Sequence, residues 1–141
     1  MRFWDTSALV PLVVAERQSI RAERWLRADS DVVVWTLTRV ELLSALARRR
    51  REEPKASRAL LTARREILTA WEQWSEVTAV ELARRHAERL VEMYTLRSAD
   101  ALQLGAALVV ADGSPASLPF VTLDGRQAEA AMAEGFPVLT A

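Results

Sequence analysis

Four carboxylates occupy similar places in the chain, because each ends a short apolar segment or lies in the first turns of a predicted helix. They are Asp5, Glu41, Asp100 and Asp124. Carboxylates that gather in one place repel each other, and a hard divalent cation with oxygen ligands relieves that repulsion. One or two such ions can activate water and stabilise the attacking and leaving oxygens of a phosphodiester. The acidic residues therefore predict metal-dependent phosphoryl chemistry.

The rest of the composition leaves catalysis to carboxylates. The chain has no cysteine and one histidine, His86. Disulfides, thiolate metal sites, a cysteine nucleophile and a Ser-His-Asp triad therefore lack their residues. The 19 cationic residues, of which only Lys55 is a lysine, balance 19 acidic ones. A net charge of zero does not favour a general nucleic-acid coat, but it permits a local basic patch.

Short apolar strands alternate with helices along the 141 residues. The predicted strands are 2–4, 32–35, 74–77, 120–123 and 138–139. The predicted helices are 6–15, 18–28, one capped by Thr36 or Thr38 and ending at 48–51, 54–71, 80–94, 99–111 capped by Ser98, and 126–133. This alternation predicts parallel strands covered on both faces by helices. The length favours one domain over residues 1–141.

The predicted sheet explains why the four acidic residues should meet. Ligands of open parallel sheets bind beyond the carboxyl ends of the strands, where the strand order reverses. Asp5 and Asp124 directly follow predicted strands, and Glu41 and Asp100 lie near the starts of helices that leave the same edge. We therefore expect a strongly negative pocket at that edge.

Each acidic residue also has a simpler interpretation. Asp5 and Asp124 can be N-caps, since a side-chain oxygen accepts from the free N–H groups of a first helical turn. Glu41 falls opposite the leucine stripe of its helix, where an exposed glutamate needs no explanation. Asp100 lies in a nearly apolar helix, so either Ser98 and the helix N-terminus satisfy its charge or a cation does.

Four segments together carry a family resemblance. They are FWDTSALVPL around Asp5, TRVELLSAL around Glu41, LRSADALQLGAAL around Asp100 and FVTLDGRQAEAA around Asp124. In this order and spacing, over nearly the whole chain, they resemble the PIN-domain ribonucleases. The likeness is greater to the VapC-type toxins of prokaryotic toxin–antitoxin pairs.

The resemblance implies a Rossmann-like, three-layer α/β/α sandwich with a mostly parallel sheet. It implies a toxin that cleaves RNA with Mg²⁺ or Mn²⁺, forms a homodimer and binds a cognate antitoxin protein. It assigns Asp5, Glu41, Asp100 and Asp124 to the catalytic metal site. It gives Thr6, Ser7 and Thr122 a supporting role through their hydroxyls. Asp5 would then bind the ion directly or through water, with Ser7 orienting it.

Other residues could contact RNA or a partner. Arg97 and Arg126 lie nearest the acidic segments and are the candidates for substrate binding. The remaining arginines alternate with glutamates, and we interpret most of them as paired, solvated helix faces. Trp71 and Trp74 could anchor a partner, although a place in the core is the preferred interpretation. His86 is expected at a helix surface.

Other functions remain as alternatives. A phosphohydrolase of the haloacid dehalogenase type also places an aspartate after its first strand. It needs a second aspartate where this chain has Ser7, and a catalytic lysine where Lys55 is the only choice. A nucleotide-binding module lacks support because the four glycines form no phosphate-binding motif. A catalytically silent PIN-like module that only binds a partner is a further alternative.

The sequence also predicts a cytoplasmic protein without a membrane segment. The start, MRFWD, lacks the long apolar core of a signal peptide. The longest apolar stretch, near residues 101–111, is too short to span a bilayer.

Overall fold

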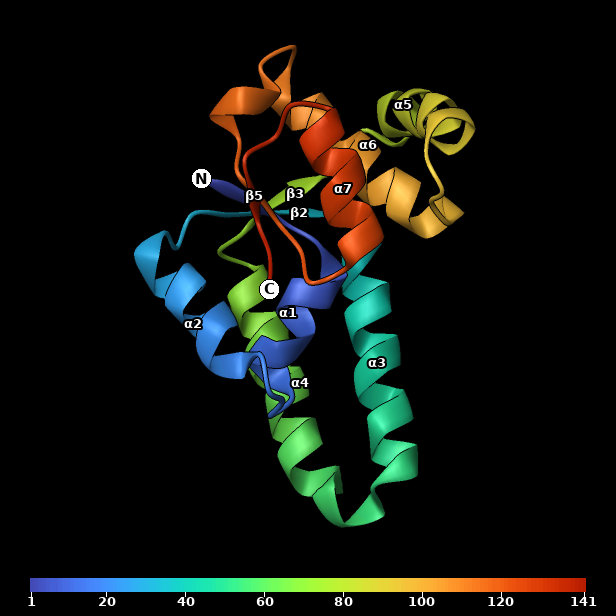
Figure 1. The fold of residues 1–141 in the computed structure, drawn as a ribbon. Helices are drawn as coiled ribbons and strands as arrows, with labels where there is room; N and C mark the ends of the chain where they lie inside the picture. Colours follow the sequence, from blue (N-terminus) through green and yellow to red (C-terminus); the bar gives the residue numbers. More distant parts are fainter.

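One five-stranded sheet lies at the centre of the computed structural model, which covers residues 1–141 (Figure 1). The strands are β1 (Arg2–Trp4), β2 (Val32–Trp35), β3 (Ser75–Val77), β4 (Phe120–Val121) and β5 (Val138–Leu139). Their order across the sheet is β3-β2-β1-β4-β5, and every neighbouring pair is parallel. The predicted α/β/α sandwich with a Rossmann-like sheet is therefore confirmed, and the sheet is parallel throughout.

Seven α-helices connect and cover the strands. They are α1 (Thr6–Val13), α2 (Ser19–Ala28), α3 (Thr38–Glu52), α4 (Ser57–Trp71), α5 (Val80–Met93), α6 (Ser98–Ala111) and α7 (Gly125–Ala133). Two short 3-10 helices, Pro54–Ala56 and Pro115–Ser117, lie in the connections. None of the helices combines the length and the apolar character that crossing a membrane requires.

Two predicted helix caps are wrong. The N-caps of α3 and α6 are Leu37 and Arg97, and neither side chain makes a capping hydrogen bond. Thr38 and Ser98 are instead the first helical residues. The Thr38 hydroxyl is buried and accepts a hydrogen bond from a side chain of another helix, which explains why it does not cap its own.

The strand β4 ends at Val121, two residues earlier than predicted. The next two residues use their polar groups at the sheet edge. The Thr122 hydroxyl donates to Asp5 over 2.9 Å, and the Leu123 N–H donates to the Ser7 hydroxyl over 2.9 Å. These contacts draw the chain across the edge and end the strand.

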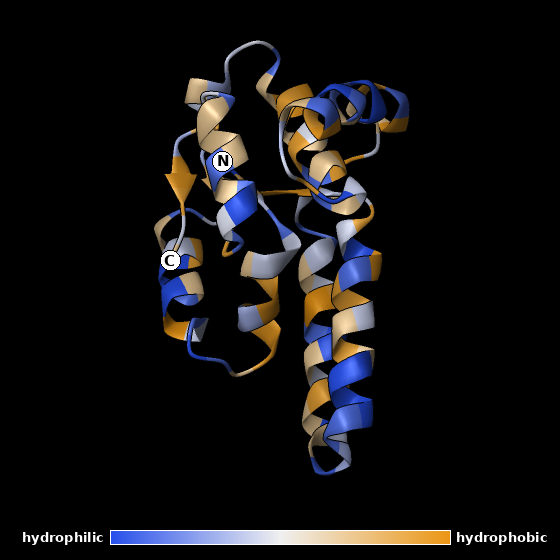
Figure 2. Cartoon of the chain, turned by 45° about the vertical axis from the view of Figure 1, so that its right-hand side comes forward, coloured by the Kyte–Doolittle hydropathy of each residue, from blue (hydrophilic) through white to orange (hydrophobic).

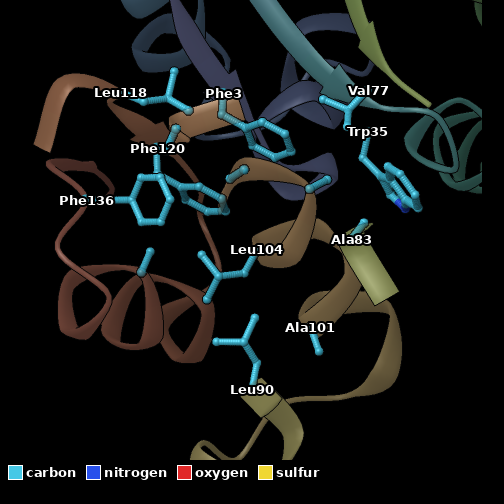
Figure 3. Packing of buried hydrophobic residues seen from close by; sticks show 14 of the residues in the cluster. Phe3, Trp35, Val77, Ala83, Leu90, Ala101, Leu104, Leu118, Phe120 and Phe136 are labelled. Carbon is cyan, nitrogen blue, oxygen red and sulfur yellow. The ribbon is translucent and has the colours of Figure 1, made fainter. Parts of the chain in front are cut away.

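Alternate residues of each strand serve two separate cores. Phe3, Val33 and Phe120 point to the side covered by α5, α6 and α7, where Phe3 and Phe120 stack with ring centroids 5.4 Å apart (Figure 3). Trp4 and Val121 point to the opposite side, which α1, α3 and α4 cover. Because side chains alternate across a strand, five short strands are enough to fix both helical layers.

The strand order reverses between β1 and β4. The chain builds outwards from β1 through β2 to β3, and then returns to the other side of β1 to form β4 and β5. The carboxyl ends of β1 and β4 therefore flank the crevice where open parallel sheets bind ligands. Asp5 and Thr122 are the first residues after those two ends.

The helices α3 and α4 form a long antiparallel hairpin that extends well beyond the sheet (Figure 1). An apolar seam between them contains Leu46, Leu60 and Ala63. Hydrophilic residues follow the outer side of the hairpin and its tip (Figure 2). The hairpin starts at the sheet edge, because α3 begins three residues after β2 ends.

Candidate active site

Asp5 is held at the centre of the edge by three donors. Its Oδ2 atom accepts from the Ser7 hydroxyl (2.5 Å), the Thr122 hydroxyl (2.9 Å) and the Ser7 N–H (3.3 Å). The residue is only 4% exposed. Its extended backbone (φ −76°, ψ 152°) also makes it the N-cap of α1. Asp5 is thus the N-cap of α1, as one interpretation predicted, and it also lies at the sheet edge where the site was expected.

The hydroxyls around Asp5 form a chain of fixed direction. Ser7 accepts from the Leu123 N–H and Thr122 accepts from the Asp124 N–H (3.1 Å), while both donate to Asp5. Because both hydroxyl protons point to Asp5, the 3.1 Å contact between the two hydroxyl oxygens is not itself a hydrogen bond. Each hydroxyl is therefore committed to holding Oδ2 in one position.

The other oxygen of Asp5, Oδ1, has no donor within the chain. The buried side-chain polar atoms that lack a partner are Trp4 Nε1, Gln103 Oε1 and Gln127 Oε1. Because Oδ1 is not one of them, it keeps contact with solvent. Asp5 therefore presents one fixed, unpaired oxygen at the open side of the edge.

Burial is the main influence on the charge of Asp5. It raises the pKa of Asp5, and the nearby charge of Asp100 adds to the rise. The hydrogen bonds from Ser7 and Thr122 act against burial, because they stabilise the ionised form. The net effect is a raised pKa of Asp5.

Glu41 lies in the first turn of α3 and is half-buried rather than freely exposed. Burial and the charges of Asp5 and Asp100 raise the pKa of Glu41, whereas hydrogen bonds from Thr6 and Gln103 lower it. Thr6 is therefore a partner of Glu41 and not of Asp5. The interpretation of Glu41 as a residue of the solvent-facing surface does not fit these contacts.

Gln103 is a residue that the sequence did not identify. Its Nε2 atom contacts the hydroxyls of Thr6 (2.8 Å) and Thr38 (2.7 Å) and Oε1 of Glu41 (3.2 Å). One amide on α6 thus connects the first turns of α1 and α3. The only signal in the sequence is a polar residue in a nearly apolar helix.

Asp100 and Asp124 line a second part of the edge. With Arg97, Leu123, Gly125 and Arg126 they surround a hollow of about 520 Å³. Asp124 is the N-cap of α7, and its Oδ1 accepts from the N–H groups of Arg126 (2.9 Å) and Gln127 (3.0 Å).

Asp100 is half-buried in the first turn of α6. Burial and the charge of Asp124 raise the pKa of Asp100, while the Arg97 backbone and the charges of Arg97 and Arg126 lower it. Ser98, one of the groups predicted to satisfy Asp100, is the first residue of α6 and does not cap it. A second buried amide, Gln127 Nε2, donates to the Asp100 carbonyl (3.0 Å) and ties α7 to α6.

The structure brings all the predicted site residues to one edge. Charge interactions connect Asp5 with Asp100, Glu41 with both, and Asp100 with Asp124. No three of these acidic side chains are arranged as a ready-made cage for one ion. The donor set nevertheless fits a magnesium-like ion, which keeps several waters and needs only one or two carboxylates as direct ligands.

Of the two tryptophans expected in the core, Trp71 lies there and Trp74 is partly buried against it. Trp71 is buried and donates from Nε1 to Glu76 (3.1 Å), and Trp74 packs against it with ring centroids 5.8 Å apart. His86 lies half-buried on α5. The predicted pairing of arginines with glutamates holds on α5, where Arg84, Arg85 and Arg89 each form an ion pair.

The raised pKa values predict an unusual pH dependence. A carboxyl whose pKa is higher in the folded chain binds protons more tightly there than in the unfolded chain. Without divalent ions, Asp5, Glu41 and Asp100 should therefore add stability as the pH falls from neutral through their raised pKa values towards the ordinary values of 3.8 and 4.5. Thermal melting between about pH 7 and pH 5 measures this contribution.

Comparison with Asp5→Asn isolates the effect, since Asp29 and Glu134 have lowered pKa values and act in the opposite direction. The variant should gain less stability on acidification than the wild type. Identical pH profiles for the two proteins would contradict the prediction.

The sequence model of the PIN domain family matches residues 2–133. No curated protein sequence matches significantly.

Several solved structures share the fold. A toxin–antitoxin complex from Klebsiella pneumoniae aligns with a TM-score of 0.69 at 17% identity, over 99% of this chain and 97% of that one. FitAcB from Neisseria gonorrhoeae aligns with a TM-score of 0.60 at 15% identity, over 99% of this chain and 96% of that one. PAE2754 from Pyrobaculum aerophilum aligns with a TM-score of 0.57 at 22% identity, over 92% of this chain and 78% of that one. The family match extends over nearly the whole chain, from β1 to α7, and includes all four acidic residues. The chain therefore belongs to the PIN domain family.

Proposed function

We propose that residues 1–141 form a single nuclease domain that hydrolyses RNA phosphodiesters with Mg²⁺ or Mn²⁺ and acts as the toxin of a type II toxin–antitoxin pair. PIN domains are generally nucleases. The observation that carries the proposal is the buried Asp5 carboxylate, which three donors fix through Oδ2 while Oδ1 stays free and the charges of Glu41 and Asp100 lie nearby. A buried carboxylate without a counter-charge is costly, and a cationic ligand at the free oxygen would offset that cost.

The residues that would hold the ion are Asp5, Glu41, Asp100 and Asp124, directly or through water. When bound, the ion supplies charge stabilisation and an activated water for hydrolysis. Ser7 and Thr122 hold Asp5 in one orientation, and Thr6 and Gln103 hold Glu41. Partners of this kind often change ligand affinity about 10- to 100-fold when they are removed.

Arg97 and Arg126 are the proposed substrate contacts. They line the same hollow as Asp100 and Asp124. A phosphate bound there would therefore lie close to arginine guanidinium groups and to the acidic edge. This arrangement places substrate charge against arginine and leaves the carboxylates for the ion.

The proposal includes an antitoxin partner and a homodimer. The antitoxin partner is supported by the fold similarity to a toxin–antitoxin complex from Klebsiella pneumoniae. Beside Glu41 lies a hollow of about 310 Å³ lined by Trp35, Leu37, Val40, Ser98, Ala99 and Leu102. Val40 is 64% exposed and Leu37 is 45% exposed. An apolar surface next to an acidic site suits a partner that covers the site.

The phosphohydrolase alternative is poorly supported by the positions of its residues. Lys55 lies in the 3-10 helix at the tip of the α3–α4 hairpin, far along the chain path from the acidic edge. Ser7 stands where the second aspartate would be needed, and its hydroxyl donates to Asp5. A silent partner-binding module is distinguished from a nuclease by the next experiment.

Adding Mn²⁺ to the purified, partner-free protein should raise its melting temperature. An ion that binds only the folded state at a hundredfold excess over its Kd stabilises by about 2.7 kcal/mol. For a chain of this size, that corresponds to a rise in Tm of roughly 5 to 10 °C. The same ion should support RNA cleavage that EDTA stops. Absence of both effects at millimolar Mn²⁺ would refute the nuclease proposal.

A further inference from the structure

The charge of this neutral chain is strongly asymmetric. Residues 48–65, here called the distal hairpin, contain eight cationic and two acidic residues, a net charge of +6. The other 123 residues contain eleven cationic and seventeen acidic residues, a net charge of −6. The distal hairpin joins the end of α3 to the start of α4 and lies at the part of the molecule that extends beyond the sheet (Figure 1).

The cations of the distal hairpin are largely unpaired. Arg49 forms ion pairs with Glu16 and Glu53, and no other cation of this segment forms one. The seven without an ion pair are Arg48, Arg50, Arg51, Lys55, Arg58, Arg64 and Arg65. This corrects the prediction that most arginines are paired helix faces, which holds for α5 but not here.

Local helix energetics do not explain the distal hairpin. Cations in the last turn of α3 suit the negative end of that helix dipole. However, Lys55 precedes α4 and Arg58 lies in its first turn, where the positive end of the dipole disfavours them and where α4 itself has no acidic residue. The run from Arg48 to Arg51 also places like charges three residues apart. Helix stability therefore does not account for the cations at these positions.

The surface chemistry of the distal hairpin fits a polyanion. Protein interfaces and membrane-bound helices need exposed apolar or aromatic anchors. The only large exposed hydrophobic side chain in this segment is Leu61, and the apolar seam of the hairpin is turned inward. Arginine forks bind phosphate groups in two-point contacts. A nucleic-acid backbone therefore fits better than a protein or lipid surface.

We propose that the distal hairpin is an RNA-binding arm that contacts phosphates of the strand outside the acidic site. The identity of RNA as substrate rests on the proposed function. Glu41 and Arg51 lie on the same helix, about 15 Å apart along its axis at 1.5 Å per residue. A strand seated at the acidic edge can thus extend along α3 and meet the cations at its far end.

The test compares two charge-matched variants. The arm variant is Arg51→Gln, Arg58→Gln and Arg65→Gln, and the control is Arg27→Gln, Arg84→Gln and Arg85→Gln. All six side chains are exposed, and glutamine keeps the helix propensity of arginine. Binding of a fluorescent 2′-O-methyl RNA of about 15 nucleotides is measured by anisotropy in EDTA over a range of salt concentrations, with thermal melting to check that each variant is folded.

The arm variant should bind roughly 10- to 100-fold more weakly than the wild type at about 0.1 M salt, and its salt slope should fall by about 2, whereas the control should stay close to wild type. Equal weakening of both variants, or unchanged binding by the arm variant, would overturn the proposal. If the arm variant keeps RNA binding but loses binding to polyglutamate, the surface serves an acidic protein instead. The nuclease proposal fails separately, through absent metal-dependent cleavage by the wild type.

Discussion

Replacing Asp5 by asparagine is expected to lower metal-dependent RNA cleavage roughly 100- to 1,000-fold. Metal ions supply several kcal/mol of transition-state stabilisation, and each 1.36 kcal/mol corresponds to a factor of ten in rate. The metal-free variant should melt at the wild-type temperature or higher, because a buried charge is removed. Its amide oxygen can still accept from Ser7 and Thr122, and asparagine is a good N-cap.

The matched control is Asp112→Asn, which removes a charge from an exposed aspartate at the end of α6. Its backbone is left-handed (φ 44°), a conformation that asparagine tolerates. Expression of the wild type or of Asp112→Asn without an antitoxin should arrest growth, and Asp5→Asn should relieve the arrest. Full cleavage and full arrest with Asp5→Asn would remove this residue from the reaction.

Asp5 shows what sequence can predict about such a site. The short apolar run before Asp5 indicates a buried strand, and the hydrophobic pattern changes from that of a strand to that of a helix directly after it. An acidic residue at this change marks the polar end of the strand. The predicted parallel direction of the strands then places their carboxyl ends at one edge of the sheet. For this reason the sheet, and the edge shared by Asp5, Glu41, Asp100 and Asp124, could be predicted without any contact being known.

The amides could not be predicted in the same way. Whether Gln103 faces Thr6 and Glu41 depends on how α6 is rotated and how closely it approaches α1 and α3. Gly105 shows how close α6 packs to the neighbouring helix, since a Cβ there would lie 2.5 Å from the Ala83 carbonyl oxygen of α5. Such distances come from packing, to which local sequence contributes only weakly.

The prediction that most arginines pair with glutamates was wrong for the α3–α4 hairpin, for a different reason. Spacing of three or four residues makes an ion pair possible, but it does not decide whether the pair forms, because a pair at a solvated surface contributes little. On α5 the pairs form, whereas Arg48 and Arg51 remain unpaired at the far end of α3. Only the fold shows that the segment containing these residues extends beyond the sheet (Figure 1).

Asp124 has two possible roles that a pair of substitutions can separate. As an N-cap it uses Oδ1 to accept from Arg126 and Gln127, and asparagine offers the same oxygen without the charge. Alanine removes both the cap and the charge, and loss of a cap costs about 1 kcal/mol, or roughly 2 to 4 °C in Tm.

We expect Asp124→Asn to melt like the wild type without metal, yet to lose most metal-dependent cleavage and most of the stabilisation by Mn²⁺. Asp124→Ala should lose activity to the same extent and should also melt at a lower temperature. If Asp124 is only a cap, Asp124→Asn should cleave RNA fully, and the defect of Asp124→Ala should be confined to stability. Melting curves with and without Mn²⁺, measured beside RNA cleavage for both variants, distinguish the two results. Because the Asp124 N–H also donates to the Thr122 hydroxyl that holds Asp5, only the asparagine variant, which keeps the cap, tests the charge of Asp124 without disturbing its neighbour.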